Sequence, residues 1–156
     1  MTTPPDSEGE PPLGRMSGFR ELVDYRVTVW QPDFAEIQIQ LGPEHMNRMG
    51  IVHGGVHMTL LDAAMGHAAT FCTVEGNRRG AVTVSMTTQF LAASRGGVLI
   101  GRGYLVGAHG RNATCRGEIV DDAGALLMAS QASFRYLAGA ERPEGVPPTS
   151  SAAKAG

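Results

Sequence analysis

The sequence has little of what marks several large classes of protein. Its 156 residues contain only two cysteines, Cys72 and Cys115, whose spacing fits no disulfide framework, so we interpret them as free thiols of a cytoplasmic protein. The net charge is −2 and no cluster of lysine and arginine forms a basic stripe, which argues against nucleic acid as a partner. The first residues lack the basic and apolar regions of a secretory signal. The most apolar window, residues 56–74, is interrupted by Asp62 and two histidines, which argues against a membrane partner.

Proline, glycine and glutamate gather at the two ends of the chain, where no hydrophobic periodicity is present. We therefore expect disordered tails over residues 1–16 and over residues 139–156. Residues 17–138 remain as one domain. The chain is 42% hydrophobic and 18% charged, which is an ordinary composition for a globular domain with a core.

Within this domain the pattern predicts one helix and several strands. A helix is expected from Gly54 or Gly55 to about Cys72, and it carries no lysine, arginine or glutamate, which is typical of a helix enclosed by other structure. Alternating apolar residues predict strands over residues 25–31, 34–41, 81–91, 97–108, 112–120 and 126–137. Segment 81–91 places Val84, Met86, Thr88 and Phe90 on one face. Since short connections join antiparallel neighbours, we predict an α+β fold in which an antiparallel sheet of about five or six strands wraps around one long central helix.

The most informative segment is NRMGIVHGGVHMTLLD, residues 47–62. The triplet His53-Gly54-Gly55 opens the predicted helix, and a helix start exposes backbone N–H groups that can stabilise a developing negative charge. Asp62 is the only acid on that helix, and a lone carboxylate on an apolar surface is costly unless it is compensated or used in chemistry. Together these two features suggest hydrolysis of an acyl compound.

The order Asn47, Gly50, His53-Gly54-Gly55 and Asp62 resembles the hotdog-fold acyl-CoA thioesterases of the PaaI type, which belong to the 4-hydroxybenzoyl-CoA thioesterase superfamily. The later segments AVTVSMTTQFLAASRGGVLIGRG and DDAGALLMASQASFRYL are similar to strands of that family. The resemblance covers residues 19–137. It implies the hotdog fold, a homodimer or a dimer of dimers, and an acyl-CoA substrate bound at the interface between two chains.

The residues that match the family motif are Asn47, His53, Gly54, Asp62 and Thr83. Asp62 would act as general base or nucleophile, and the helix-start amide would polarise the thioester carbonyl. Asn47 would donate to the same oxygen or hold the attacking water, which the Thr83 hydroxyl could also hold. His53 would orient the loop or donate near the leaving sulfur. We expect no metal and no cofactor, because CoA is part of the substrate.

Geometry adds a prediction about assembly. Eight residues separate Gly54 from Asp62, which is about 12 Å along a helix axis. One substrate carbonyl therefore cannot easily touch both groups of one chain. Two helices related by a two-fold axis would bring Asp62 of one subunit beside Gly54 of the other. We therefore expect shared active sites and an obligate dimer.

The expected substrate contacts are Gly55 at the helix start and four apolar side chains, Met58, Leu61, Met65 and Phe90. Arg111 is our candidate for the CoA phosphates, although it could equally be a solvated surface residue. The motif residues have ordinary alternatives: a plain helix-start turn, a satisfied buried acid, a loop cap at Asn47 and a common strand residue at Thr83. Two functional alternatives stand beside the thioesterase: a non-catalytic acyl-CoA-binding hotdog protein, and a hotdog hydratase. The spacing of His53 and His57 would suit a helical metal site, but no third ligand is placed nearby.

Overall fold

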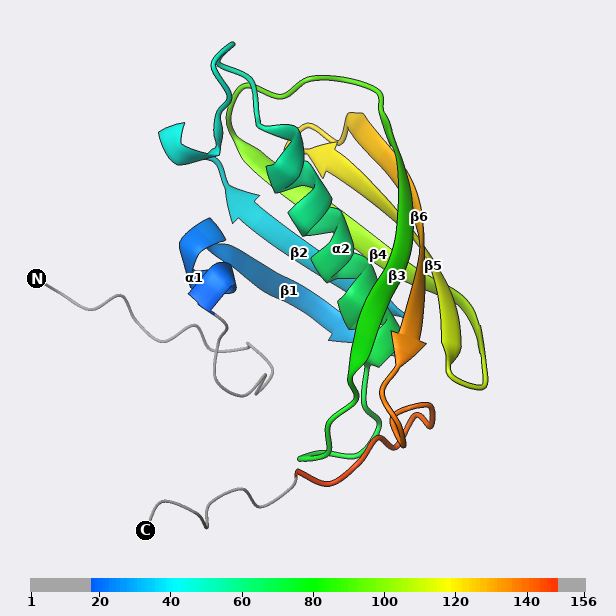
Figure 1. The fold of residues 1–156 in the computed structure, drawn as a ribbon. Helices are drawn as coiled ribbons and strands as arrows, with labels where there is room; N and C mark the ends of the chain where they lie inside the picture. The colour runs from blue at the N-terminus through cyan, green and yellow to red at the C-terminus, as the bar shows by residue number, and fades with distance from the viewer. Residues whose placement is uncertain (1–17, 149–156) are drawn as a thin grey trace, which may run out of the picture.

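A computed structural model describes residues 18–148 of the chain. The expected tail of residues 1–16 and the last residues, 149–156, lie outside the described residues. The elements in order are α1 (Gly18–Val23), β1 (Tyr25–Gln31), β2 (Phe34–Gln40), the 3₁₀ turn η1 (Pro43–His45), α2 (Gly54–Thr70), β3 (Ala81–Phe90), β4 (Val98–His109), β5 (Asn112–Asp121) and β6 (Leu126–Tyr136). The six strands form one antiparallel sheet that curves around α2 (Figure 1). This confirms the predicted hotdog architecture.

The strand order is β1-β2-β4-β5-β6-β3. Consecutive strands are neighbours except for β3, which pairs with β6 at the far edge of the sheet. Our expectation that all closely spaced strands are neighbours is therefore wrong for β3 and β4. The connection between them arches over the start of α2 (Figure 1), and it is held there by hydrogen bonds from the Leu91 amide to the Leu127 carbonyl and from the Val52 amide to the Ser94 carbonyl. As a result, β3 is an edge strand.

The sheet holds α2 at close range because glycines face it. A Cβ atom at Gly103 of β4 would collide with the backbone of Ala64, and one at Gly101 would lie 2.8 Å from Leu60. Leu61 and Met65 fill the space over Gly117 of β5. Side chains from α2 and the concave face of the sheet thus form one continuous core.

A β-bulge interrupts β3 near its beginning. Thr83 pairs with Phe134 and Ser85 pairs with Ser133, so Val84 is the extra residue. In a regular strand Thr83 and Met86 would point to opposite faces, because side chains alternate. The bulge lets Thr83 reach α2 while Met86 also packs against the core. The prediction that Val84 and Met86 lie on one face of the strand is therefore wrong. Val84 is 63% exposed, whereas Met86 packs against the core.

The ordered chain extends beyond the expected domain limit. Residues 139–148 belong to the tail that we expected to lack structure, yet they pack beside the end of α2 and the loop that follows it. The Arg79 guanidinium donates to the carbonyls of Ala140 and Glu141, and Arg78 bridges to Val146. The short helix α1 was not predicted either. Both cysteines are free, and no helix among the described residues is long and apolar enough to cross a membrane.

Candidate active site

The start of α2 presents one amide without an acceptor. His53 caps the helix: its Nδ1 accepts a 2.9 Å hydrogen bond from the Gly55 amide, and its carbonyl accepts one from the Val56 amide. Within residues 18–148 no acceptor is assigned to the Gly54 N–H. Of the two glycines that we considered, Gly54 is therefore the one free to bind a substrate oxygen. The Gly55 amide is occupied by the cap, and through this bond the His53 side chain orients the helix start.

Asn47 organises the loop before α2. Its Oδ1 accepts hydrogen bonds from the amides of Met49 (2.8 Å) and Ile51 (3.4 Å), which is the loop-capping role considered above. The same bonds fix the orientation of the side chain. Among the described residues the Asn47 Nδ2 has no acceptor, so it remains a second donor near Gly54.

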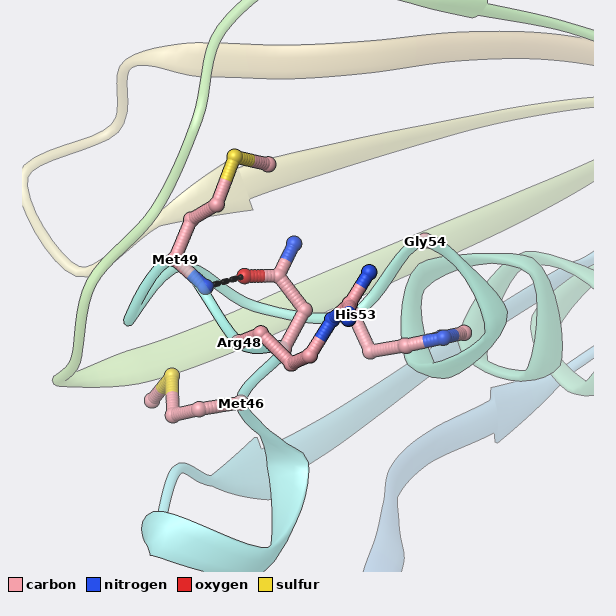
Figure 2. A pocket seen from close by; sticks show the side chains of 6 residues that line it. Met46, Arg48, Met49, His53 and Gly54 are labelled. Carbon is pink, nitrogen blue, oxygen red and sulfur yellow. Dashed lines mark hydrogen bonds between the residues drawn. The ribbon is translucent and has the colours of Figure 1, made fainter.

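Two pockets meet at Asn47 and Gly54, which line both of them. The first, of about 520 Å³, is completed by Met46, Met49, Arg48 and His53 (Figure 2). The second, of about 320 Å³, is mostly apolar. Its other lining residues are Ile51, Val52, His57 and Phe90 to Ala93. A group bound at Gly54 and Asn47 therefore has a mixed hollow with Arg48 and two methionines on one side and a mostly apolar hollow on the other.

Asp62 lies two turns further along α2, in a different pocket. The Thr83 hydroxyl donates a 2.7 Å hydrogen bond to the Asp62 Oδ1, so α2 and β3 are tied together at this point. The surrounding pocket, of about 290 Å³, also includes Gly66, His67 and Arg79. The Arg79 guanidinium bonds to backbone carbonyls and stacks on Tyr136, so it is engaged in the structure around the site.

The five motif residues thus form two clusters within one chain. Asn47, His53 and Gly54 gather at the start of α2, and Asp62 and Thr83 gather at the beginning of β3. No described pocket contains members of both clusters. The spacing of four between Gly54, Met58 and Asp62 puts all three on one face of α2, and Met58 is half-buried between the clusters.

Two of the expected substrate contacts are wrong. Leu61 and Met65 are fully buried in the core of this chain, where they pack over Gly117, so they cannot line an interface. Phe90, by contrast, is exposed at the end of β3, and its ring lies 3.3 Å from the position of a Cβ on Gly54. It lines the apolar pocket beside Gly54, and its contact with substrate stays a prediction.

Arg111 lies between β4 and β5, and its Nε donates a 2.9 Å hydrogen bond to the Tyr136 carbonyl. Since Tyr136 pairs with Ala81, this arginine belongs to the end of the sheet where β3 begins. It is thus on the side of the Asp62–Thr83 cluster and remote from Gly54 in its own chain.

Two residues beside Gly54 were not predicted from the sequence. Arg48 lines the larger of the two pockets, and His57 lines the apolar pocket one turn after His53. The sequence signal for His57 is its position four residues after His53, which was interpreted only as a possible metal-binding spacing. Within the described part of the chain no three His, Cys, Asp or Glu side chains come together as a metal site.

Comparisons with known proteins agree with this fold. A curated protein of Archaeoglobus fulgidus named "Putative esterase" is 27% identical over 130 residues, which make up 83% of this chain and 79% of that protein. A mutant of the phenylacetic acid degradation protein PaaI from Thermus thermophilus superposes with a TM-score of 0.68 at 24% identity, covering 78% of this chain and 100% of that one. Thioesterase HI1161 from Haemophilus influenzae gives a TM-score of 0.69 at 18% identity, covering 76% and 82%. At these identities the two structures show a shared fold.

The family signature extends over most of the ordered domain. The profile of the Thioesterase superfamily matches residues 49–143, a span that begins in the loop before α2 and ends after β6. It includes His53, Gly54, Asp62 and Thr83. The chain therefore belongs to the Thioesterase superfamily.

Proposed function

We propose that this protein hydrolyses an acyl-CoA thioester to a carboxylic acid and free CoA. The observation that carries the proposal is the pairing of a carboxylate, Asp62, oriented by the Thr83 hydroxyl, with a free helix-start amide at Gly54. Membership of the Thioesterase superfamily supports the reaction class. Two of its relatives, which carry the names "Putative esterase" and thioesterase, support the same class.

The chemistry follows from the two clusters. The Gly54 amide and the positive end of the α2 dipole stabilise the oxyanion that forms on the thioester carbonyl. The Asn47 side-chain amide donates to the same oxygen. Thr83 holds Asp62 Oδ1, and among the described residues Oδ2 has no donor, so this oxygen is available to take a proton from water or to attack the carbonyl carbon. When Asp62 acts as a base, the carbon–sulfur bond breaks after attack by the water oxygen, and the departing CoA thiolate takes up the proton that Asp62 removed from water. When Asp62 attacks directly, loss of the thiolate leaves a mixed anhydride, which water then hydrolyses to the carboxylic acid while supplying the proton of the CoA thiol.

The assembly that this chemistry needs is a dimer. The outer side of β3 is an unpaired sheet edge, and Val82 and Val84 are exposed along it. Two copies that pair through this edge about a two-fold axis must be antiparallel. The Phe90 end of one strand, beside Gly54, then meets the Thr83 end of the second copy, beside Asp62. Each of the two active sites would thus combine the amide cluster of one chain with the carboxylate of the other.

The substrate runs through the two pockets that share Asn47 and Gly54. The thioester carbonyl belongs at these two donors. The apolar pocket suits the acyl group, whereas the larger of the two pockets suits the CoA arm, because Arg48 there can pair with its phosphates. Arg111 of the second copy remains a further candidate for the phosphates, because the start of β3 would approach the first copy's Gly54 in such a pair.

Thiol release from a panel of acyl-CoAs tests the reaction. We expect turnover by the wild type and a loss of most of kcat in Asp62→Asn, with binding retained, because the carboxylate acts mainly in the transition state. Equal rates for wild type and Asp62→Asn on every substrate would overturn the enzyme proposal. Binding of acyl-CoA without turnover would leave the non-catalytic binding protein.

A mixing experiment tests the shared site. Asp62→Asn and Gly54→Val chains are each expected to be inactive, since the valine side chain blocks approach to the amide. A one-to-one mixture refolded together forms heterodimers in which one of two sites has both residues intact. We expect recovery of roughly a quarter of the wild-type activity. If sedimentation confirms dimers but no activity is recovered, the Gly54 amide and the Asp62 carboxylate must act within the same chain.

A further inference from the structure

The first turn of α2 contains a buried histidine without a partner. His57 is 4% exposed, and neither Nδ1 nor Nε2 makes a hydrogen bond within the described structure. The carbonyl of His53, one turn earlier, already accepts from the Val56 amide. The pocket that His57 lines is mostly apolar, and the Phe90 ring stands edge-on to the imidazole with ring centres 6.5 Å apart.

An imidazole in this setting is costly for the folded chain. A buried polar group that has lost water and gained no hydrogen bond destabilises the fold. Burial also lowers the pKa of His57, an effect that the nearby His53 backbone opposes only in part. The ring is therefore neutral near pH 7, with one nitrogen that can donate a hydrogen bond and one that can accept one. Leucine or methionine would fill the same position without this cost.

His57 lines the apolar pocket that begins at Gly54 and Asn47. Apart from Asn47, the other side chains of that pocket are apolar, so His57 is the only ionisable group among its described lining residues. Three residues separate Gly54 from His57, which is about 4.5 Å along the helix axis. An acyl group whose carbonyl binds at Gly54 therefore runs past the buried His57 ring a few bonds down its chain. A ligand oxygen would bond to the ring once one of the covered nitrogens is opened to the pocket.

We propose that His57 selects acyl groups that carry a hydroxyl or oxo oxygen a few bonds from the thioester, over acyl groups that are hydrocarbon throughout. This inference rests on the proposed function for the position of the carbonyl. An oxygen substituent supplies the partner that both ring nitrogens lack. A purely hydrocarbon chain leaves the buried imidazole unpaired, and sites of this kind discriminate strongly against the ligand that lacks the polar group.

Equilibrium binding tests the selectivity without requiring turnover. The probes are S-hexyl-CoA and its 3-, 4- and 5-hydroxyhexyl counterparts, which are thioethers and cannot be hydrolysed. We expect the wild type to bind at least one hydroxylated probe about tenfold or more tightly than S-hexyl-CoA in calorimetry. His57→Leu should bring all four Kd values within about threefold of one another by tightening S-hexyl-CoA and weakening the hydroxylated probe. His57→Gln, which keeps a donor and an acceptor, should retain part of the preference.

His109→Leu is the matched control, because it makes the same change at an exposed position at the end of β4. It should leave the selectivity of the wild type unchanged. The inference is overturned if the wild type binds all four probes alike, if it binds none, or if His57→Leu keeps the preference. Selective binding lost in His57→Leu, in a protein that hydrolyses no acyl-CoA, would support the inference and overturn the proposed reaction. Hydrolysis in which the ratio of kcat/KM for hexanoyl-CoA to kcat/KM for hydroxyhexanoyl-CoA is the same in wild type and His57→Leu would support the proposed reaction and overturn the inference.

Discussion

The Thr83 hydroxyl and the Asp62 carboxylate are joined by a 2.7 Å hydrogen bond that links the edge strand β3 to the central helix α2. The bond exists because the bulge at Val84 turns Thr83 toward the helix. It fixes one carboxylate oxygen and leaves the other without a donor among the described residues. In the proposed mechanism Thr83 is a positioning residue, whose effect on the reaction passes through Asp62.

Replacing Thr83 should slow the reaction without abolishing it. In Thr83→Val the carboxylate loses its orienting donor, and we expect kcat to fall about tenfold with KM little changed, whereas Asp62→Asn should lose at least about a hundredfold. Thiol-release kinetics measure both. Thr28→Val is a matched control, because Thr28 also bonds to a carboxylate, Glu36, but on the opposite edge strand. A Thr83→Val enzyme with full kcat would show that the hydrogen bond has no part in catalysis.

A charge placed on the exposed edge of β3 should separate the proposed dimer. Val84→Lys puts a lysine on the unpaired edge, where it opposes strand pairing. We expect a folded monomer by sedimentation equilibrium, with most of the thioesterase activity lost because each proposed site needs two chains. Val106→Lys, at a position of β4 that is equally exposed at 62%, should stay dimeric and active. A monomeric Val84→Lys protein with wild-type activity would contradict the shared site.

Acid should destabilise the folded chain through two histidines. Burial lowers the pKa of His57 and of His67 below the ordinary value of 6.5. As the pH falls below 6.5, the unfolded chain binds protons that the folded chain does not, so the free energy of unfolding falls with a slope of at most about 1.4 kcal/mol per pH unit for each histidine. Above about pH 7 both histidines are neutral in the folded and in the unfolded chain, so this loss of stability is absent there.

Urea unfolding between pH 5.5 and pH 7.5 measures this dependence. His57→Leu should flatten the slope, and it should also raise the free energy of unfolding at pH 7.5 by about 1–3 kcal/mol, because an unpartnered buried polar group is removed. His109→Leu provides the comparison at an exposed site. An unchanged pH slope in His57→Leu would mean that this ring is solvated in the native state.

Two arginines can be compared as partners of the CoA phosphates. Arg48 lines the pocket beside Gly54, whereas Arg111 donates to the Tyr136 carbonyl at the other end of β3. We expect Arg48→Ala to raise KM for acyl-CoA about tenfold and to leave KM for the matching acyl-N-acetylcysteamine unchanged, since the latter has no phosphates. Arg111→Ala should have a smaller effect. The reverse order would assign the phosphates to Arg111, and equal KM values for all variants would exclude both.

Most strands could be predicted because their signal is local. Alternation and turn residues gave β1 over Tyr25–Gln31 without error and the other strands within a residue or so at each end. The bulge at Val84 left no such signal, since valine is an ordinary strand residue and the extra position is defined only by pairing with β6. The place of β3 beside β6 is likewise a tertiary property.

The inward face of α2 could not be predicted from the helix alone. The segment is apolar on nearly all sides, so Leu61 and Met65 looked as suitable for a substrate pocket as for the core. Two glycines of the sheet determine which face is buried. Gly103 on β4 lets the helix backbone approach, and Gly117 on β5 leaves room for the Leu61 and Met65 side chains. The two residue clusters followed from the spacing of Gly54 and Asp62, but the unpaired ring of His57 became visible only when its surroundings were known.

The glycine at position 103 has a consequence for how the enzyme can evolve or be redesigned. A single methyl group at this position would collide with the helix backbone at Ala64. The distance between α2 and the sheet is therefore set by direct contact of the two backbones. In the proposed mechanism the oxyanion donor and the carboxylate are both carried on this one helix, so its position sets the offset of each relative to the second subunit of the proposed dimer. Mutations that reshape the proposed acyl or CoA pocket should therefore accumulate without disturbing the register of the reacting groups, whereas Gly103→Ala should disturb both ends at once.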